Sequence, residues 1–310
     1  MAIPVKLATQ SLTTTTGAKT LRAYLRDVPV RGGLVPHVAG VIIEVHGSVT
    51  IAADGDAERL YSVFLDSLVS SRIKAYDAAG VEIVDIDVDR LYVLNRLFRG
   101  EVVDEPQIAA DGSAHTIMAT LYIPLSHVPR LAAAPYFQPT DRLGRVELAI
   151  DTGGLSSDVT ALSATLNIYA LATYLQSRNS APILKVKQYH HNNTMSHQEI
   201  DGGLLEILAV PASGNITEIK SLAWGGGQVA DVDAGWMMVQ YAEERIIRAY
   251  NASDAPYHST LTGYWDSTPS VVPLVWTQRY TPTYSHRGPV TWQFGSNDST
   301  DYEIVVVSQG

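Results

Sequence analysis

Stretches in which apolar and polar side chains alternate recur along this chain of 310 residues. Residues 41–51 are the clearest case, with Val41, Ile43 and Val45 on one face and Glu44 and His46 on the other. A period of two is that of a β-strand with one buried and one hydrated side. Strands are also predicted at residues 73–76, 81–88, 117–123, 145–150, 162–168, 184–186, 216–224, 271–276, 290–294 and 302–307. Many short strands with few helices predict an all-β fold, a sandwich or barrel, and not a parallel α/β sheet.

Helical spacing of apolar residues is confined to three short segments. Leu60, Phe64 and Leu68 recur at every fourth residue after a capping aspartate, Asp54 or Asp56. The other two segments are residues 91–98 and 239–246. Short helices inserted between strands are therefore expected in both halves of the chain.

Two short sequence matches relate the halves. Residues 53–57, Ala-Asp-Gly-Asp-Ala, resemble residues 230–234 at an offset of 177, and residues 73–78 resemble residues 247–252 at an offset of 174. The matches lie in the same order, and a polar, Pro-containing segment at residues 176–182 lies between the halves. This pattern predicts a duplicated domain, with a first lobe at residues 40–177 and a second at 178–310.

The composition favours a surface that packs against neighbours. Hydrophobic residues make up 46% of the chain, and charged residues make up only 17%, against roughly 25% in an average soluble domain. The net charge of −10 argues against sequence-specific nucleic-acid binding, because such proteins need cations to displace counterions. Cysteine is absent, which excludes disulfides, thiolate catalysis and cysteine-ligated zinc.

Residues 1–39 are predicted to form an N-terminal arm. They contain a threonine run at 13–16 and several Pro and Gly residues, and they carry a net charge of +4 while the rest of the chain carries −14. Two interpretations stay open: the arm contacts an anionic membrane surface, or it clamps a neighbouring subunit. The contact candidates are Lys6, Lys19, Arg22 and Arg26.

No catalytic motif or cofactor fingerprint is present in the sequence. Residues 17–20, Gly-Ala-Lys-Thr, lack the leading glycine of a phosphate loop, and neither a Gly-x-Ser-x-Gly elbow nor a His-Glu-x-x-His motif occurs. We therefore expect no enzymatic activity, no catalytic residue and no cofactor. The first six residues hold no apolar signal core, so secretion is not expected.

Two residue clusters and the aromatic residues could still bind a ligand. His190, His191 and His197 could hold a metal but are expected in a hydrated loop, and Asp85, Asp87 and Asp89 could bind calcium but are expected on a charged face or at a subunit contact. All five Trp lie in the second half, where they could stack on sugar rings or pack a core. The alternative function is therefore a carbohydrate-binding β-sandwich protein, lectin-like or a glycanase.

The layout resembles that of the double jelly-roll major capsid proteins of tailless icosahedral phages with an internal membrane, such as tectiviruses and corticoviruses. The likeness rests on the strand at residues 41–50, the helix after Asp56, the Ile-[Lys/Arg]-Ala-Tyr-[Asp/Asn]-Ala pair, the Trp-Gln-Phe-Gly turn at 292–295 and the closing strand at 302–307.

This resemblance implies two tandem jelly rolls, each with a short inserted helix. It further implies a virion protein that forms homotrimeric, pseudo-hexameric capsomers of an icosahedral shell and assembles in the host cytoplasm. The implied partners are other copies of the chain, minor capsid or vertex proteins and an internal viral membrane.

Overall fold

The structure is a computed structural model in which two compact units can be described. Unit 1 comprises Met1–Val93 and Asp104–Ile183, and unit 2 comprises Leu94–Val103 and Leu184–Gly310. The described residues are 2–59, 72–99, 107–126, 137–178, 181–200, 203–211, 216–224, 227–233, 272–276, 288–295 and 298–310.

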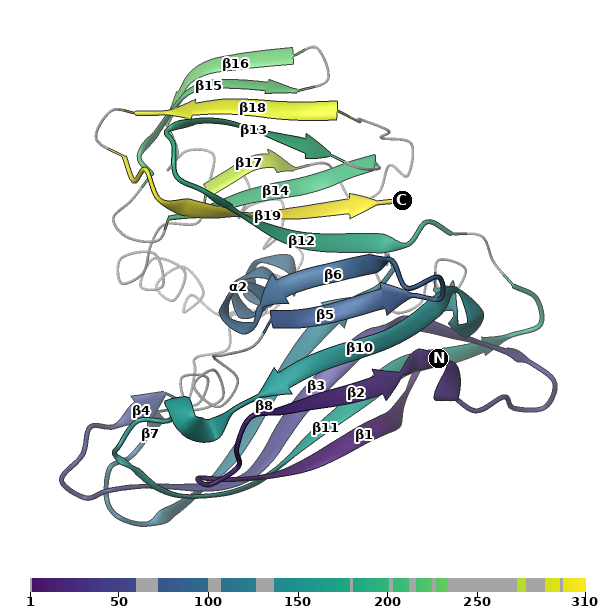
Figure 1. The fold of residues 1–310 in the computed structure, drawn as a ribbon, viewed down its shortest axis with the longest axis vertical. Coiled ribbons are helices and arrows are strands. Elements are labelled where there is room, and N and C mark those ends of the chain that lie inside the picture. Colours follow the sequence, from purple (N-terminus) through teal and green to yellow (C-terminus); the bar gives the residue numbers. More distant parts are fainter. Residues whose placement is uncertain are drawn as a thin grey trace, which may run out of the picture. The chain divides into compact units, whose positions relative to one another are not determined.

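Unit 1 contains two antiparallel sheets (Figure 1). The first, called the β1 sheet, has the order β1-β11-β3-β8, with strands β1 (Ile3–Thr13), β11 (Val159–Leu175), β3 (Val35–Ile51) and β8 (Ala114–Pro124). The second, the β2 sheet, has the order β2-β10-β5-β6, with strands β2 (Lys19–Tyr24), β10 (Leu143–Ile150), β5 (Arg72–Asp77) and β6 (Glu82–Asp87).

Shorter elements complete unit 1. Two-residue strand β9 (Gln138–Pro139) pairs with β3, and β4 (Glu58–Arg59) pairs with β7 (Gln107–Ile108). The helical elements are η1 (Leu25–Asp27), η3 (Thr140–Arg142), η4 (Thr152–Gly154) and α2 (Val88–Arg99), of which the residues from Leu94 onward belong to unit 2. Helix α2 confirms the helical spacing predicted at residues 91–98, whereas the segments expected as helices at 60–68 and 239–246 lie outside the described residues.

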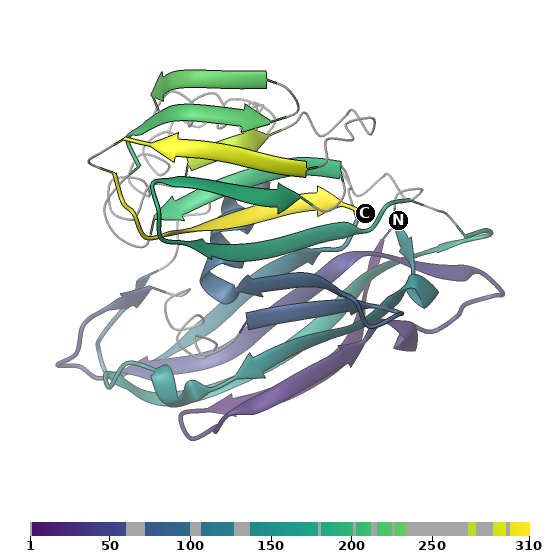
Figure 2. The ribbon, with the colours of Figure 1, turned by 45° about the horizontal axis from the view of Figure 1, so that its top comes forward.

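Unit 2 also contains two antiparallel sheets (Figure 2). The β12 sheet has the order β12-β19-β14-β17, with strands β12 (Leu184–His191), β19 (Tyr302–Gln309), β14 (Gly203–Pro211) and β17 (Val272–Trp276). The β13 sheet has the order β13-β18-β15-β16, with strands β13 (Met195–Ile200), β18 (Gly288–Phe294), β15 (Glu218–Trp224) and β16 (Gly227–Asp233).

The two units have the same topology. When the main described strands of each unit are numbered one to eight along the chain, one sheet has the order 1-8-3-6 and the other 2-7-4-5 in both units. Two four-stranded sheets connected in this way form a jelly roll. The chain is therefore all-β and consists of two tandem jelly rolls.

The alternating pattern identified the buried faces correctly. Val41, Ile43 and Val45 of β3 are buried, and the same face continues through Val49 and Ile51. In β11, Leu162, Leu166 and Ile168 lie on the buried side of a strand, which confirms the strand predicted at 162–168 although its spacing also fits a helix. The cores therefore form where the period of two places apolar residues on one face.

The prediction that residues 1–39 form an arm was wrong. These residues form β1, β2, η1 and the start of β3, and β1 pairs with β11 over its whole length. A register shift between Lys6 and Ala8 leaves Leu7 as a bulge, so the inward residues change phase halfway along the strand. The threonine run forms the turn after β1, where the Thr16 N–H donates to the Thr13 carbonyl oxygen at 3.0 Å.

The duplication is visible in the topology and not in the two sequence matches. Residues 53–57 follow β3, the third strand of unit 1, whereas residues 230–233 lie in β16, the fifth strand of unit 2, so the first match relates positions that are not equivalent. In the second match, residues 73–78 cover β5 and its turn, and residues 247–252 lie outside the described part. In this part of the chain the two units divide between Ile183 and Leu184. The limits predicted at residues 39–40 and 177–178 differ from this division because they rested on the expected arm and on the two sequence matches.

Candidate functional site

The histidines of unit 2 do not converge on a metal site. His190 Nε2 lies 3.0 Å from Asp301 Oδ1, the exposed side chain of His197 lies in β13, and His191 faces the aromatic core. Adjacent residues of a strand point to opposite faces, which separates His190 from His191. Within the described ranges, no group of three His, Asp or Glu side chains could hold a metal ion.

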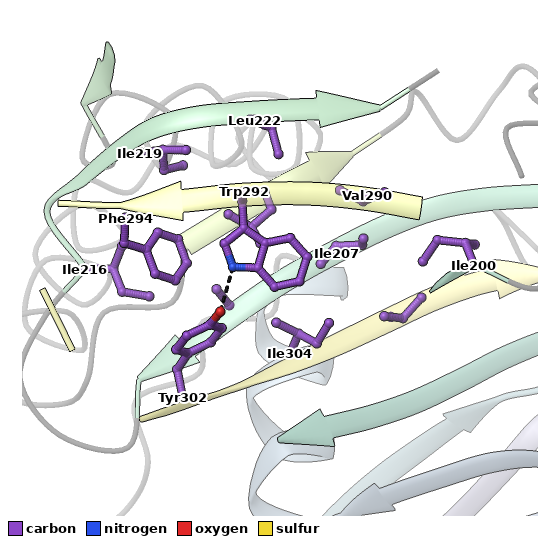
Figure 3. Close-up of a cluster of buried hydrophobic side chains, with 13 residues drawn as sticks. Ile200, Ile207, Ile216, Ile219, Leu222, Val290, Trp292, Phe294, Tyr302 and Ile304 are labelled. Atoms are coloured by element: carbon purple, nitrogen blue, oxygen red, sulfur yellow. Dashed lines mark hydrogen bonds between the residues drawn. The ribbon is translucent and has the colours of Figure 1, made fainter. Parts of the chain in front are cut away.

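The aromatic core of unit 2 contains Trp292, the one Trp whose side chain lies in the described part of the chain. Trp292 is 1% exposed, and its Nε1–H donates to the Tyr302 hydroxyl at 2.7 Å (Figure 3). The Tyr302 hydroxyl donates in turn to the Asn193 carbonyl oxygen at 3.0 Å. The His191 ring stacks on Tyr302 with centroids 5.6 Å apart, so these aromatic rings pack a core and are not displayed for sugar stacking.

Burial lowers the pKa of His191 below its ordinary value of 6.5, although a hydrogen bond with Gln198 acts in the opposite direction. Below pH 6.5 the unfolded chain therefore binds a proton on His191 that the folded chain resists, and folding stability falls as the pH falls from 6.5 toward the folded-state pKa. The His191 Nε2 atom is buried without a hydrogen-bond partner, so replacement of the imidazole by a phenyl ring removes the hydrogen bond with Gln198 and leaves the ring packing in place.

We expect His191→Phe to reduce the loss of unfolding free energy between pH 7.5 and pH 5.5. Urea unfolding of wild type and variant at equal protein concentration measures this difference. Equal losses in the two proteins would contradict the assigned role of His191.

The aspartates predicted as a possible calcium site are held by cations in the β2 sheet. Arg72 Nε lies 2.7 Å from Asp85 Oδ1 and 3.8 Å from Asp87 Oδ1. Strand β6 ends at Asp87, so Asp89 lies in α2 and does not continue the strand alternation. The carboxylates form part of a charged outer face, as the alternative interpretation predicted.

The four predicted contact cations do not form one patch. Lys6 lies in β1, where its Nζ is 5.7 Å from the centre of the Tyr169 ring, and Arg22 lies in β2, where its Nε is 2.9 Å from Glu147 Oε1. Lys19 is the exposed first residue of β2, and Arg26 lies in η1 with its Cζ 5.3 Å from the centre of the Tyr24 ring. The two sheets of unit 1 therefore divide these cations, and their contact role stays a prediction.

Residues 17–20 lead into strand β2 and not into a helix, so they lack the context of a phosphate loop.

The outer face of the β2 sheet is covered by ion pairs. Glu147 Oε1 accepts from Arg145 Nε at 2.8 Å as well as from Arg22, and Arg145 lies 4.3 Å from the centre of the Tyr76 ring. The hydrogen bond from Arg145, with a smaller contribution from Arg22, lowers the pKa of Glu147. Lys74 Nζ lies 3.1 Å from Glu82 Oε2, and this hydrogen bond raises the pKa of Lys74.

The outer face of the β1 sheet has a different character. The strand registers place its side chains in rows across β1, β11, β3 and β8, and Ser and Thr predominate toward one end. The hydroxyl-bearing residues of this face are Thr9, Ser11, Thr13, Ser48, Thr116, Thr120, Ser163 and Thr165. Among the residues that these four described strands place on the face, Lys6 and Glu44 alone carry a full charge.

A small polar cluster lies at the centre of the β1 sheet. Glu44 Oε1 lies 3.1 Å from His46 Nδ1 and accepts from Asn167 Nδ2 and from the Tyr169 hydroxyl, each at 3.3 Å. Burial, together with the Glu44 charge, raises the pKa of Tyr169. The cluster satisfies the carboxylate within the face, which stays smooth and low in net charge.

The outer face of the β13 sheet is low in charge across two of its strands, β13 and β18. Their outward side chains are Met195, His197, Glu199, Pro289, Thr291 and Gln293, among which Glu199 alone carries a full charge. The next strand, β15, carries Glu218 and Lys220, both partly exposed. The strand periodicity at 290–294 contained the signal for the uncharged part, because Thr291 and Gln293 alternate with the buried Val290, Trp292 and Phe294.

Comparison with known proteins identifies the fold. No protein-family model matches the sequence, and the search of curated proteins gives no match. Among solved structures, the major capsid protein of STIV (Sulfolobus turreted icosahedral virus) is similar at a TM-score of 0.58 and 9% identity, over 98% of this chain and 96% of that chain.

Two further solved structures match with TM-scores below 0.5. A chain of the Sputnik virophage matches at 0.40 and 9% identity, over 98% of this chain and 86% of that chain. The Faustovirus major capsid protein matches at 0.43 and 8% identity, over 98% and 90%. The match at a TM-score of 0.58 shows that the chain shares the fold of the STIV major capsid protein along nearly the full length of both.

Proposed function

We propose that this chain is a structural protein, a major capsid protein that assembles into an icosahedral virion shell. The observation that carries the proposal is the shared fold with the STIV major capsid protein across nearly both entire chains. Two jelly rolls of identical topology in one chain support it, because three copies then supply six similar lobes for a pseudo-hexagonal capsomer.

The described chemistry supports a role without catalysis. The histidines, aspartates and the Trp292 ring that could have formed a site are engaged in ion pairs or packing, or lie apart. The carbohydrate-binding alternative is not favoured, because the fold is that of a capsid protein and because Trp292, the one Trp whose side chain lies in the described part, is enclosed in the core of unit 2. Placement among the tectiviruses and corticoviruses, and contacts with vertex proteins or an internal membrane, stay predictions of the resemblance.

Among the described helices, none has the length and apolar character needed to cross a bilayer.

We expect the purified protein to form homotrimers whose images show six lobes. Each subunit contact should bury at least the roughly 1,200–2,000 Å² of a standard interface. Size-exclusion chromatography with light scattering measures the mass, and negative-stain imaging shows the outline. A monomer at micromolar concentration in neutral buffer would contradict the proposal.

A further inference from the structure

The two outer faces of the first jelly roll differ sharply in charge. On the β2 sheet, Arg22, Arg145 and Glu147 form a linked ion-pair group, and a second group joins Arg72, Lys74 and Asp85. The β1 sheet turns four rows of four residues outward, from Lys6 to Thr13 along β1, and only Lys6 and Glu44 among them carry a full charge.

Desolvation makes this difference meaningful for assembly. Removing an ion from water costs several kcal/mol even when it is paired, and the buried centres of interfaces are depleted of Lys, Glu and Asp. Hydroxyl and methyl groups are far cheaper to bury. The β2 face therefore suits contact with solvent, whereas the β1 face and the part of the β13 face formed by β13 and β18 suit contact with protein.

We propose that the β1 face of one copy packs head-to-tail on the β13 face of the next copy. The inference rests on the proposed function, which supplies the second copy, and it names the surfaces that join. A head-to-tail contact between two different faces gives a closed ring such as a trimer when the rotation from copy to copy closes, whereas a face packed on its own counterpart yields a dimer.

Two features of the faces support this pairing. Each carries a large exposed apolar side chain, Met118 on the β1 face at 63% exposure and Met195 on the β13 face at 60%, and packing would bury both. The charges are also compatible, because Lys6 lies on one face and Glu199 on the other. Exposed apolar side chains on surfaces with few charges are typical of association sites.

The β1 face supplies a large part of the area that such a contact needs. Four strands about 4.8 Å apart and four rows about 6.8 Å apart cover about 520 Å². A standard interface uses about 800 Å² on each partner. The sheet face alone therefore provides about two thirds of that area, and the loops at its ends would add the rest.

Cross-linking can test the pairing cleanly, because the chain contains no cysteine. Ser163 on the β1 face and Thr291 on the β13 face are exposed strand residues. A mixture of Ser163→Cys and Thr291→Cys proteins, treated with a short bis-maleimide, is expected to give cross-linked dimers, and the double variant is expected to give covalent trimers. Thr20→Cys, on the outer face of the β2 sheet, is the control and should not cross-link to Thr291→Cys.

A charge placed on either face provides a second measurement. Met118→Glu and Met195→Glu should each raise the dissociation constant of the assembly at least tenfold. Val81→Glu is the matched control, since Val81 is 56% exposed in the turn between β5 and β6 and should leave assembly unchanged.

The outcomes separate this inference from the proposed function. Trimers that form normally but cross-link through Thr20→Cys, or through two Ser163→Cys copies, would overturn the head-to-tail pairing and leave the capsid proposal standing. Trimers that tolerate both glutamates would also overturn it. A protein that is monomeric by light scattering would overturn the capsid proposal itself.

Discussion

Replacement of Trp292 by alanine is expected to destabilise the protein by about 3–5 kcal/mol, the usual range for an aromatic residue removed from a core. Trp292 is one of the largest fully buried side chains, and it packs in one cluster with Ile207, Phe294 and Ile304. Its loss leaves a cavity between the two sheets of unit 2 (Figure 3). Urea unfolding followed by far-UV circular dichroism measures the change.

The matched variant Trp292→Phe separates packing from hydrogen bonding. Phenylalanine keeps an aromatic ring at the site but removes the Nε1–H that donates to the Tyr302 hydroxyl. That hydroxyl still donates to the Asn193 carbonyl oxygen, so the expected cost of the lost hydrogen bond is about 1 kcal/mol. Hydrogen exchange should accelerate in the strands of unit 2 for Trp292→Ala. A cost below about 1 kcal/mol for the alanine variant would contradict the burial of this ring.

Local patterns predicted which residues are buried better than they predicted which strands pair. The alternation at 41–51 depends on neighbouring residues alone, and β3 reproduces it. The partners of β3 are β11 and β8, which lie far along the chain, and no local pattern specifies them. The resemblance to double jelly-roll proteins supplied the topology that periodicity could not.

The first strand shows how a local irregularity hides a strand. Ile3 and Val5 lie opposite Ala172 and Ala170 of β11, and after the bulge Ala8 and Leu12 take over the same side. A strict period of two therefore breaks at Leu7. Proline has no N–H to donate to a neighbouring strand, so it is tolerated in strands at the edge of a sheet. Pro4 fits β1 for this reason, because the described pairing of β1 is with β11, on one of its two sides.

Assembly surfaces were harder to predict than the core. The positive charge of residues 1–39 suggested one contact patch, but β1 and β2 belong to different sheets, and Arg22 is bound to Glu147 from a strand more than a hundred residues away. Only the registers show that Ser, Thr and Met from four separated strands form one face with few charges. Which residues share one outer face of a sheet therefore depends on the order and register of its strands.

Gly47 provides the second large expected effect, and this one lies in unit 1. Its φ is +154°, and a Cβ atom placed there would lie 2.3 Å from the Ser163 carbonyl oxygen and 2.5 Å from Ala164 Cα. Both contacts are with the backbone of β11, which pairs with β3 along its length and cannot move aside cheaply. Conformational strain and overpacking each cost about 1–3 kcal/mol, so we expect Gly47→Ala to lower the unfolding free energy by about 3–5 kcal/mol.

Two other glycines separate the two contributions to this cost. Gly80 has a φ of +83°, and a Cβ atom added there would meet nothing within 4 Å, so Gly80→Ala should show the strain alone, about 1–2 kcal/mol. Gly17 has neither a positive φ nor a close neighbour, and Gly17→Ala should be neutral or stabilise by up to about 1 kcal/mol. The order Gly47 above Gly80 above Gly17 in urea unfolding is the expected result. A Gly47→Ala cost no greater than that of Gly80→Ala would mean that β3 and β11 do not approach as closely as their register requires.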